Sequence, residues 1–513
     1  MRGENGLSNG TGLILAVMCL ATFMAILDTS LVNLGLKSIQ QDLGADTAAL
    51  QWVIDLYNLT YAVFILTGGT LGDLYGRRRV FVLSVAVFAV GTIVCAIAPS
   101  GGMLVLGRGV AGLGAALELP VALAILNVTY PHAAKRARAI AVWGGMNGLA
   151  MAIGPTVGGT LVDTWGWRSL FWAILPVAAI TGALGMTLVP ESSDPNGRDL
   201  DLAGQVFAIV TLAALCVGFI EGPKWGFATW PILGCFVLFV IGLCIFLVIE
   251  HRSQSPLVPL TIFRDRAFSA SLAAASLMTF GMYGLLFVLP LFLQTVKGAP
   301  ATRAGIELLP MSATFFVVSL VAGSLANAWG PRVVIPLGMT LTGAGLLTLA
   351  SISASGGYSS IAAALFAVGL GLGLITGPIA TVAVANAPAA RSGMSSGLVN
   401  VGRMVGATLG VAFLGLIFGP RIEEAAKVAP HFVAAMSLCF VIGAAAQFLG
   451  AVIALIWLRR DSLQTKTHRT ESPSEVALPN AQRRQASHQS RPLSSRISSK
   501  ASVPAGHEDE TKH

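Results

Sequence analysis

The sequence predicts an all-α polytopic membrane protein, and three observations lead to this fold class. Of the 513 residues, 55% are hydrophobic and only 11% are charged, whereas soluble domains are about 25% charged. The mean hydropathy is +0.76. The apolar residues form continuous runs of the length that a helix needs to cross a bilayer. This composition excludes an ordinary soluble enzyme, a disordered protein and a nucleic-acid binder, and the continuous runs exclude alternating barrel strands.

Fourteen apolar runs are long enough to be spanning helices. They cover residues 13–35, 50–71, 80–98, 104–128, 139–163, 168–189, 203–220, 230–249, 267–294, 305–327, 333–352, 360–385, 397–418 and 432–457. The first run is too long for a typical signal peptide. We therefore expect it to remain as the first helix.

The basic residues indicate how these helices are oriented. With the N-terminus in the cytoplasm, 15 Lys and Arg residues fall on the inner side and 7 on the outer side. This count leaves aside the tail after Arg460, and Arg108 and Arg403 within the runs. Cytoplasmic loops carry the excess of basic residues. Both termini are therefore predicted to be cytoplasmic.

An internal repeat divides the chain into two similar halves. The segments "GTLGDLYGRRR" at residue 69 and "GSLANAWGPRV" at residue 323 are offset by 254 residues. The matching pairs are Gly69 and Gly323, Asp73 and Asn327, Gly76 and Gly330, and Arg78 and Arg332. Such repeats are typical of transporters whose substrate path lies between the halves.

The repeat and the runs together predict the domain organisation. It comprises a cytoplasmic N-terminus (1–12), a six-helix half (13–189), a cytoplasmic linker (190–202), a two-helix insertion (203–249), a second cytoplasmic linker (250–266), a second six-helix half (267–457) and a disordered cytoplasmic tail (458–513). The tail is rich in Ser, Pro, Gln and Arg and poor in aromatic residues, which is typical of disorder.

Several motifs in a fixed order carry a family resemblance. They read "LDTSLVNLGL" in the first run, "GTLGDLYGRRR" after the second, "GRGVAGLGAALELP" in the fourth, "GLAMAIGPTVGGTL" in the fifth, and "FLQTVKGAPATRAGIELLP" and "SGLVNVGRMVGATLG" in the second half. Together they resemble the fourteen-helix drug:proton antiporters of the major facilitator superfamily, the EmrB/QacA type. The resemblance covers residues 12–460 and implies the major facilitator fold.

Apart from Asp163, the last residue of its run, four acids fall within the apolar runs: Asp28, Asp55, Glu118 and Glu307. Charged groups at membrane depth are costly, so such acids are functional candidates. A carboxyl group in this setting can take up and release a proton near physiological pH. When ionised, it attracts a cationic drug. One carboxyl that cannot hold both proton and drug would couple their opposite flows.

Each acid has a functional and a plainer interpretation. The resemblance places Asp28 on the proton and substrate path, and the plainer interpretation is a structural pair with a neighbouring helix. An acid at the position of Asp55 is similar to the pattern of the quaternary-ammonium exporters of this branch. The plainer interpretation is a residue in contact with water where the helix begins. Glu118 lies near mid-membrane, two residues before the helix-bending Pro120, where transporters of this kind place their sites. The plainer interpretation is a neutral acid that is hydrogen-bonded between helices. Glu307 is best explained by an ion pair with Arg303, four residues earlier.

Arg108 is a basic residue within the fourth run. Arginine stays charged and needs a carboxylate or carbonyl partner, for which Asp28 is the candidate at similar depth. Protonation of that partner would leave the arginine uncompensated and so link a proton to a conformational change. The alternative is that Arg108 extends to the outer surface.

The resemblance implies a cytoplasmic latch between the halves. Its residues are Gly69, Asp73, Gly76, Arg77 and Arg78. We expect Asp73 to meet the N-terminus of the helix that begins near Ser396 and Gly397, where free N–H groups favour an anion, and Arg403 to join this network. Alternatively, the loop arginines only set the topology.

The fifth run contains the sequence GPxxGG, formed by Gly154, Pro155, Gly158 and Gly159. Small residues permit close helix contact and proline permits a bend. In the family this antiporter motif marks exporters. Aromatic residues that could stack on a lipophilic cation, or simply pack between helices, are Trp52, Trp143, Phe280, Tyr283 and Phe287.

The sequence therefore predicts a secondary antiporter of the bacterial cytoplasmic (inner) membrane that exports amphipathic, often cationic compounds in exchange for protons by alternating access. No cofactor or metal is expected, and the proton gradient supplies the energy. The expected partners are small lipophilic or cationic substrates, protons and membrane lipid, with a periplasmic adaptor if the source is Gram-negative, and no nucleic acid. The absence of a Walker-type loop argues against an ATP-driven pump.

Other functions were also compared with the sequence. A metabolite or antibiotic exporter, or a proton-linked importer, can use the same fold. An integral-membrane enzyme is disfavoured because no metal, haem or nucleophile pattern is present. A non-transporting membrane sensor or scaffold would not need acids within its helices.

Overall fold

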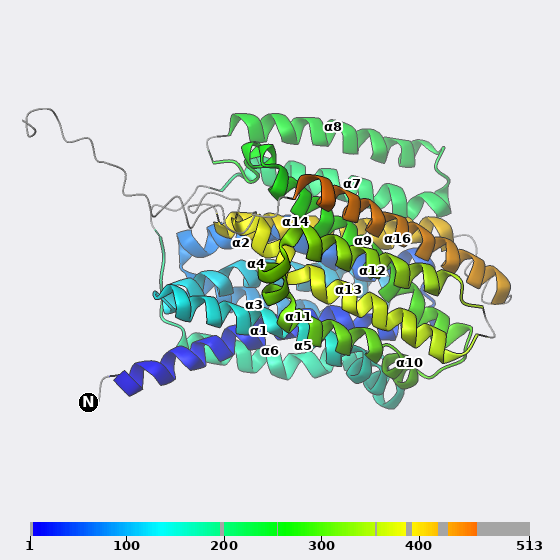
Figure 1. Cartoon of the computed structure of the whole chain (residues 1–513), viewed down its shortest axis with the longest axis horizontal. Helices are drawn as coiled ribbons and strands as arrows, with labels where there is room; N and C mark the ends of the chain where they lie inside the picture. The colour runs from blue at the N-terminus through cyan, green and yellow to red at the C-terminus, as the bar shows by residue number, and fades with distance from the viewer. Residues whose placement is uncertain are drawn as a thin grey trace, which may run out of the picture. The chain divides into compact units, whose positions relative to one another are not determined.

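The computed structural model describes residues 4–194, 200–253, 255–353, 356–385, 392–418 and 429–458. In these ranges the chain forms fifteen α-helices and one 3₁₀-helix, with no β-strand (Figure 1). Fourteen helices are long and apolar enough to cross a membrane, which confirms the predicted fold class and helix number. The predicted disordered tail lies outside the described residues from position 459 onward.

The helices of the first half and the insertion are α1 (Glu4–Leu43), α2 (Thr47–Tyr75), α3 (Arg77–Ala96), α4 (Gly101–Thr129), α5 (Ala133–Trp165), α6 (Arg168–Leu188), α7 (Leu202–Trp225) and α8 (Trp230–Arg252). The rest of the chain forms η1 (Leu260–Arg264), α9 (Arg266–Thr295), α10 (Ala301–Glu307), α11 (Leu309–Trp329), α12 (Pro331–Ala350), α13 (Tyr358–Ala385), α14 (Ser392–Phe418) and α16 (Ala429–Trp457).

Glycines let α4 lie directly against its two neighbours. A Cβ atom on Gly114 would lie 2.6 Å from Cα of Phe88 on α3, and one on Gly112 would lie 2.9 Å from Cα of Tyr57 on α2. Side chains of that size would separate the backbones, so the Gly-rich motif of α4 is a packing surface. It holds the helix that carries Arg108 and Glu118 against α2.

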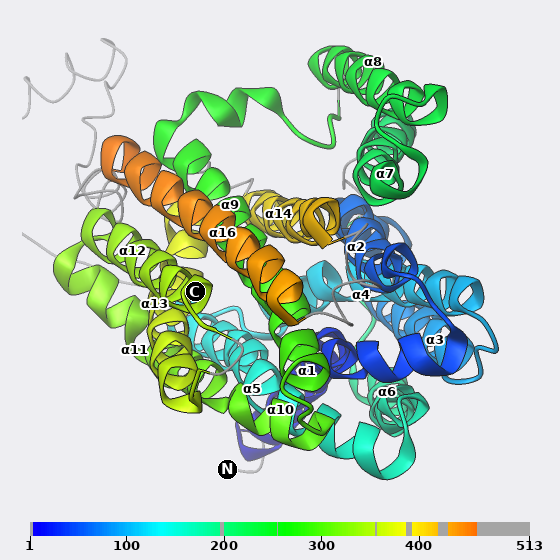
Figure 2. The same cartoon turned by 90° about the vertical axis from the view of Figure 1, so that its right-hand side faces the viewer.

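The second half repeats this arrangement around α13. A Cβ atom on Gly369 would lie 2.9 Å from Cα of Met311 on α11, and one on Gly371 would lie 2.7 Å from the backbone nitrogen of Thr342 on α12. Helices α11, α12, α13 and α16 lie together in Figure 2. The glycine-rich helices α4 and α13 are therefore packed in the same way in each half.

The repeated loop motif forms the same sharp turn in both halves. Gly76 lies between α2 and α3 with φ of 102°, and Gly330 lies between α11 and α12 with φ of 84°. L-residues are strained at such angles, whereas glycine is not. The offset of 254 residues thus relates two equivalent helix junctions.

Replacing Gly76 with alanine should destabilise the folded protein by about 1–2 kcal/mol because of this positive φ. The new Cβ would also lie 2.7 Å from Oε1 of Glu191. Thermal unfolding of the purified protein in detergent measures the loss. Gly323→Ala is the matched control, since a Cβ there meets nothing within 4 Å. Equal stability of the two variants would contradict a requirement for glycine at the turn.

The two-helix insertion packs on α2 through α7, while α8 contacts α7 and otherwise presents an apolar surface (Figures 1 and 2). Polar contacts fasten α7 to α2 along its length. Near the start of α7, Gln205 Nε2 donates to the Val63 carbonyl at 3.0 Å, and the Thr67 hydroxyl donates to the Gln205 side chain. Near its end, Trp52 Nε1 donates to Glu221 Oε1 at 2.8 Å, and Lys224 Nζ donates to Asp46, the N-cap of α2, at 2.7 Å. Because α7 also packs on α14, the insertion covers a line where the halves meet.

One predicted helix boundary is wrong. The run at 305–327 was expected to be continuous, but α10 ends at Glu307 and α11 begins at Leu309. Pro310 lacks the N–H group that would bond to the carbonyl of Ile306 in a continuous helix. The break therefore places Glu307 in a separate short helix.

Candidate functional site

A buried ion pair joins α1 to α4. Nη1 of Arg108 donates to Oδ2 of Asp28, and the two residues are 2% and 0% exposed. Nε of Arg108 also donates to the Val53 carbonyl at 3.0 Å, and the guanidinium lies 4.3 Å from the centre of the Tyr57 ring. The suggested pairing with Asp28 is therefore present, and the alternative of an arginine reaching the outer surface is wrong.

Two other acids are buried without any hydrogen-bond partner among the described residues. Both carboxyl oxygens of Glu118 on α4, and both of Asp55 on α2, are buried and unpaired. This excludes a wetted helix entry for Asp55 and an interhelical hydrogen bond for Glu118. An apolar interior accommodates an unpaired carboxyl as the neutral acid far more readily than as the anion. Both groups are thus placed where gain or loss of a proton has a large energetic effect.

Arg403 on α14 faces tyrosines from both halves. It interacts electrostatically with Tyr61 of α2 and with Tyr283 of α9. Tyr61 in turn interacts electrostatically with Glu118. The structure therefore places Arg403 in the interior with these tyrosines and apart from Asp73, where the latch network was expected.

Glu307 is accounted for by its neighbours. Nε of Arg303 donates to Oε1 of Glu307 at 2.8 Å within α10. The hydroxyl of Tyr358 donates to the Glu307 backbone carbonyl at 3.1 Å. The plain interpretation, an ion pair four residues apart, is the one that the structure shows.

The loop motif binds a segment that follows α6. Asp73 accepts hydrogen bonds from Nε and Nη2 of Arg77 at 3.0 and 2.7 Å. The amide of Asp194 donates to the Asp73 carbonyl at 2.9 Å. Glu191 accepts a hydrogen bond from the Arg78 amide at 3.0 Å and also lies 3.7 Å from the Arg78 guanidinium. The motif is thus held within the first half.

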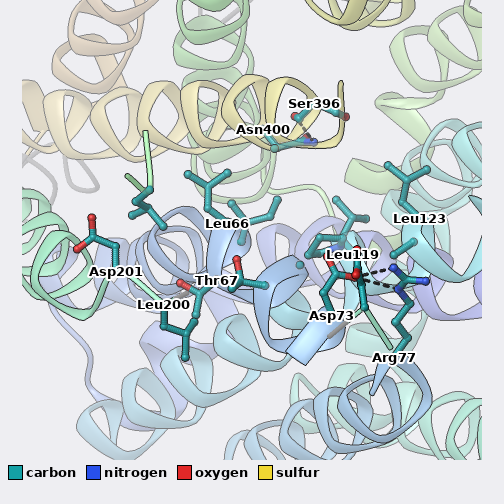
Figure 3. Close-up of a pocket in the computed structure, with 18 of the residues that line it drawn as sticks. Leu66, Thr67, Asp73, Arg77, Leu119, Leu123, Leu200, Asp201, Ser396 and Asn400 are labelled. Atoms are coloured by element: carbon teal, nitrogen blue, oxygen red, sulfur yellow. Dashed lines mark hydrogen bonds and ion pairs between the residues drawn. The ribbon is translucent and has the colours of Figure 1, made fainter. Parts of the chain in front are cut away.

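A cavity of about 480 Å³ separates the loop motif from α14 (Figure 3). Asp73 and Arg77 lie on one wall, and Ser396 and Asn400 of α14 lie on the other. The predicted contact between Asp73 and the start of this helix is therefore replaced by an open space. The cavity also reaches Leu119, next to Glu118.

At the opposite end of the helices, the GPxxGG motif brings the halves into direct backbone contact. Gly154 and Gly158 pack against Ser30 and Leu31 of α1; a Cβ on Gly158 would lie 3.2 Å from Cα of Leu31. A Cβ on Gly159 would overlap the carbonyl oxygen of Ala301 on α10. On α10, a Cβ on Gly305 would likewise overlap the carbonyl oxygen of Pro155.

Polar contacts close the same end. The carboxylate of Asp163 on α5 accepts hydrogen bonds from the amides of Ala301 and Thr302 at 3.0 and 2.6 Å. Lys37 Nζ donates to the Gln294 carbonyl at 2.5 Å. The halves therefore meet closely at the end distant from the loop motif, whereas a cavity lies between them at the motif end.

Sequence reasoning did not identify Asp163 or Glu191 as contact residues. Asp163 lies four residues after Gly159 and so one helical turn further along α5. That spacing on the motif's helix was the available signal. Glu191 lies in a Ser- and Pro-rich segment that reads as a linker. Its contact with the arginine cluster depends on how α6 packs beside α3.

Comparison with known proteins agrees with this architecture. The family model described as Major Facilitator Superfamily matches residues 18–411. The chain is 38% identical over 415 residues to the multidrug resistance protein Stp of Mycobacterium tuberculosis, covering 80% of this chain and 76% of that protein. It is 33% identical over 411 residues to the tetracenomycin C resistance and export protein of Streptomyces glaucescens, covering 80% and 76%.

Solved structures share the fold. A peptide transporter POT in complex with sulfate matches with a TM-score of 0.63 at 17% identity, covering 86% of this chain and 94% of that chain. A bacterial homolog of the human lysosomal transporter Spinster matches with a TM-score of 0.59 at 16% identity, covering 87% and 97%. With a family model that spans most of its helices and a close sequence relative, the chain belongs to the Major Facilitator Superfamily.

Proposed function

We propose that this protein is a proton-coupled secondary antiporter that exports amphipathic, often cationic drugs by alternating access. The observation that carries the proposal is the buried Asp28–Arg108 ion pair, and the unpartnered carboxyl groups of Glu118 and Asp55 lie on α4 and α2, the helices that carry or contact this pair. Relatives named for multidrug resistance and antibiotic export support the direction of transport. The superfamily consists of transporters, so the protein is not an enzyme.

Proton uptake acts on the ion pair between α1 and α4. Protonation of Asp28 removes the negative charge that compensates Arg108, which keeps only the Val53 carbonyl and the Tyr57 ring. A buried charge that loses its partner is strongly destabilised. The helices are then driven toward an arrangement in which Arg108 is better solvated or paired.

A continuous series of contacts leads from this pair to the junction between the halves. Ser30 and Leu31 follow Asp28 on α1 and pack on Gly154 and Gly158 of α5. Gly159, on the same helix, packs on α10 of the second half. A shift of α1 therefore changes the contact that holds the halves together at one end.

Substrate enters the cavity at the loop-motif end. The fifteen basic residues counted for this side support a cytoplasmic orientation of this end. In this orientation both termini are cytoplasmic, and the closed end lies at the opposite face of a bacterial inner membrane. Glu118 attracts a cation when it is ionised and releases it when it is protonated. Proton and cationic substrate thereby exclude each other at one carboxyl, which couples their opposite flows without a cofactor. Lipid surrounds the helices, and a periplasmic adaptor would meet the closed end in a Gram-negative cell.

Everted membrane vesicles test this function. An imposed proton gradient should drive ethidium uptake, and added ethidium should in turn draw protons out. Glu118→Gln should lower proton-driven ethidium uptake at least about tenfold, since a charge-assisted contact contributes about 1.5–3 kcal/mol. Leu123→Met, on the same helix and lining the same cavity, is the control. Absence of proton movement with any substrate would refute antiport, and substrate accumulation in the same direction as protons would indicate an importer.

A further inference from the structure

We infer that Arg403 binds an anionic oxygen group of the substrate, so that the transporter also exports amphipathic carboxylates, phenolates or enolates. This inference rests on the proposed function and names a substrate class for it. Its basis is that one of the two arginines in the helix interior is satisfied by the protein and the other is not.

Close packing holds the backbone at Arg403 in place. The hydroxyl of Thr279 on α9 donates to the Arg403 carbonyl at 2.6 Å, and that of Ser276 donates to the Gly402 carbonyl at 2.8 Å. A Cβ on Gly406 would overlap the Ser276 carbonyl oxygen. This segment of α14 is therefore positioned by α9, and the Arg403 side chain extends from a rigid base.

The Arg403 guanidinium has no carboxylate partner among the described residues. Arginine remains charged at every relevant pH, and a charge at membrane depth needs compensation. Asp28 is bound to Arg108 and Glu307 to Arg303. The Arg403 side chain is only partly buried. By contrast, Arg108 is 2% exposed and has an acid, a carbonyl and an aromatic ring as partners.

The surroundings of Arg403 suit an amphipathic ligand. Tyr61 and Tyr283 lie within electrostatic range of the guanidinium. Asn400, one turn earlier on α14, lines the cavity together with Leu119 and Trp143. The cavity thus has apolar walls for the body of a ligand, and Arg403 lies three residues beyond Asn400 on the same helix.

Anionic oxygens are the complementary chemistry. The guanidinium presents a planar fork that binds carboxylate-like groups through two charge-assisted hydrogen bonds. A neutral Glu118 leaves Arg403 as the uncompensated charge of this region, whereas an ionised Glu118 attracts cations. Two separate residues therefore serve two substrate classes, one through Glu118 and one through Arg403.

Two probes with one apolar body and opposite charges test the inference: pyrenebutyrate and pyrenebutyl-trimethylammonium. Proton-driven uptake of each is measured in everted vesicles, with a protonophore to subtract passive entry. In Arg403→Gln the ratio of anion to cation uptake should fall about tenfold or more, as expected for loss of a charge-assisted bond. Arg403→Lys keeps the positive charge but lacks the planar guanidinium, so its ratio of anion to cation uptake should lie between those of wild type and Arg403→Gln. Arg303→Gln, which removes a mostly exposed arginine, should leave the ratio unchanged.

Binding to purified protein separates recognition from folding and transport. Pyrene fluorescence should show that both Arg403 variants bind pyrenebutyrate more weakly than wild type. The loss of affinity in each variant should parallel its loss in the ratio of anion to cation uptake. Equal losses for both probes, or unchanged anion binding in Arg403→Gln, would overturn the inference. Wild type that moves the cation but not the anion would overturn it too and leave the proposed function intact. Wild type that moves neither probe against a proton gradient would count against the proposed function itself.

Discussion

Asp28→Asn is expected to abolish proton-coupled transport, with a fall of at least about a hundredfold. The substitution leaves the Arg108 guanidinium without a counter-charge at a site where both residues are almost fully buried. Breaking one side of a buried ion pair costs about 3–5 kcal/mol. The asparagine also cannot take up a proton. The measurement is proton-driven ethidium uptake in everted vesicles, normalised to the amount of inserted protein.

A double variant separates coupling from stability. Asp28→Asn combined with Arg108→Gln removes both charges of the pair. Because no unpaired ion remains at this site, the variant should recover much of the thermal stability lost in Asp28→Asn, but none of the proton-driven uptake. Proton-driven uptake in either variant at the wild-type rate would show that the pair is structural and that protons bind elsewhere.

Gly159→Leu is expected to stop transport by holding the halves apart at the end distant from the loop motif. Any Cβ at Gly159 overlaps the Ala301 carbonyl oxygen, and a leucine adds three further carbon atoms. Overpacking of a close contact costs about 1–3 kcal/mol or more. Alternating access requires this contact to form in every cycle, so uptake should fall below about a tenth of wild type.

Accessibility of a cysteine reports the same change directly. In a Cys244→Ser background, which removes an exposed native thiol, Thr302→Cys should react slowly with a membrane-impermeant maleimide. Gly159→Leu should make this reaction faster. Gly145→Leu is the matched control on α5, because a Cβ there meets nothing within 4 Å. Slow labelling and normal uptake in Gly159→Leu would show that closure does not depend on this contact.

The spanning helices were predictable because membrane insertion depends on local composition. Each run of apolar residues carries its own signal, and no distant residue alters it. The boundary at Glu307 was missed for a local reason, since Pro310 lies within the predicted run and breaks it. The offset between Gly76 and Gly330 was visible because a positive φ selects glycine at both turns.

The partners of the interior charges were only partly predictable. Depth along each helix suggested Asp28 for Arg108, which is the pair observed. The family resemblance placed Asp73 with the start of the helix near Ser396, but Arg77 binds it in the structure. An adjacent partner four residues away competes with any partner across a cavity, and the sequence does not show which conformation is occupied.

The sequence by itself determined the membrane class, the number of helices, the repeat and the short list of interior charges. Each of these follows from composition or from spacing along one helix. Only the tertiary structure decided which charges are compensated. Arg108 and Arg403 are alike in sequence terms, and they differ because the rotation and height of α1 bring a carboxylate to one and not to the other. The contact of Gly159 with α10 likewise depends on two backbones from opposite halves, because close packing is a property of their relative position.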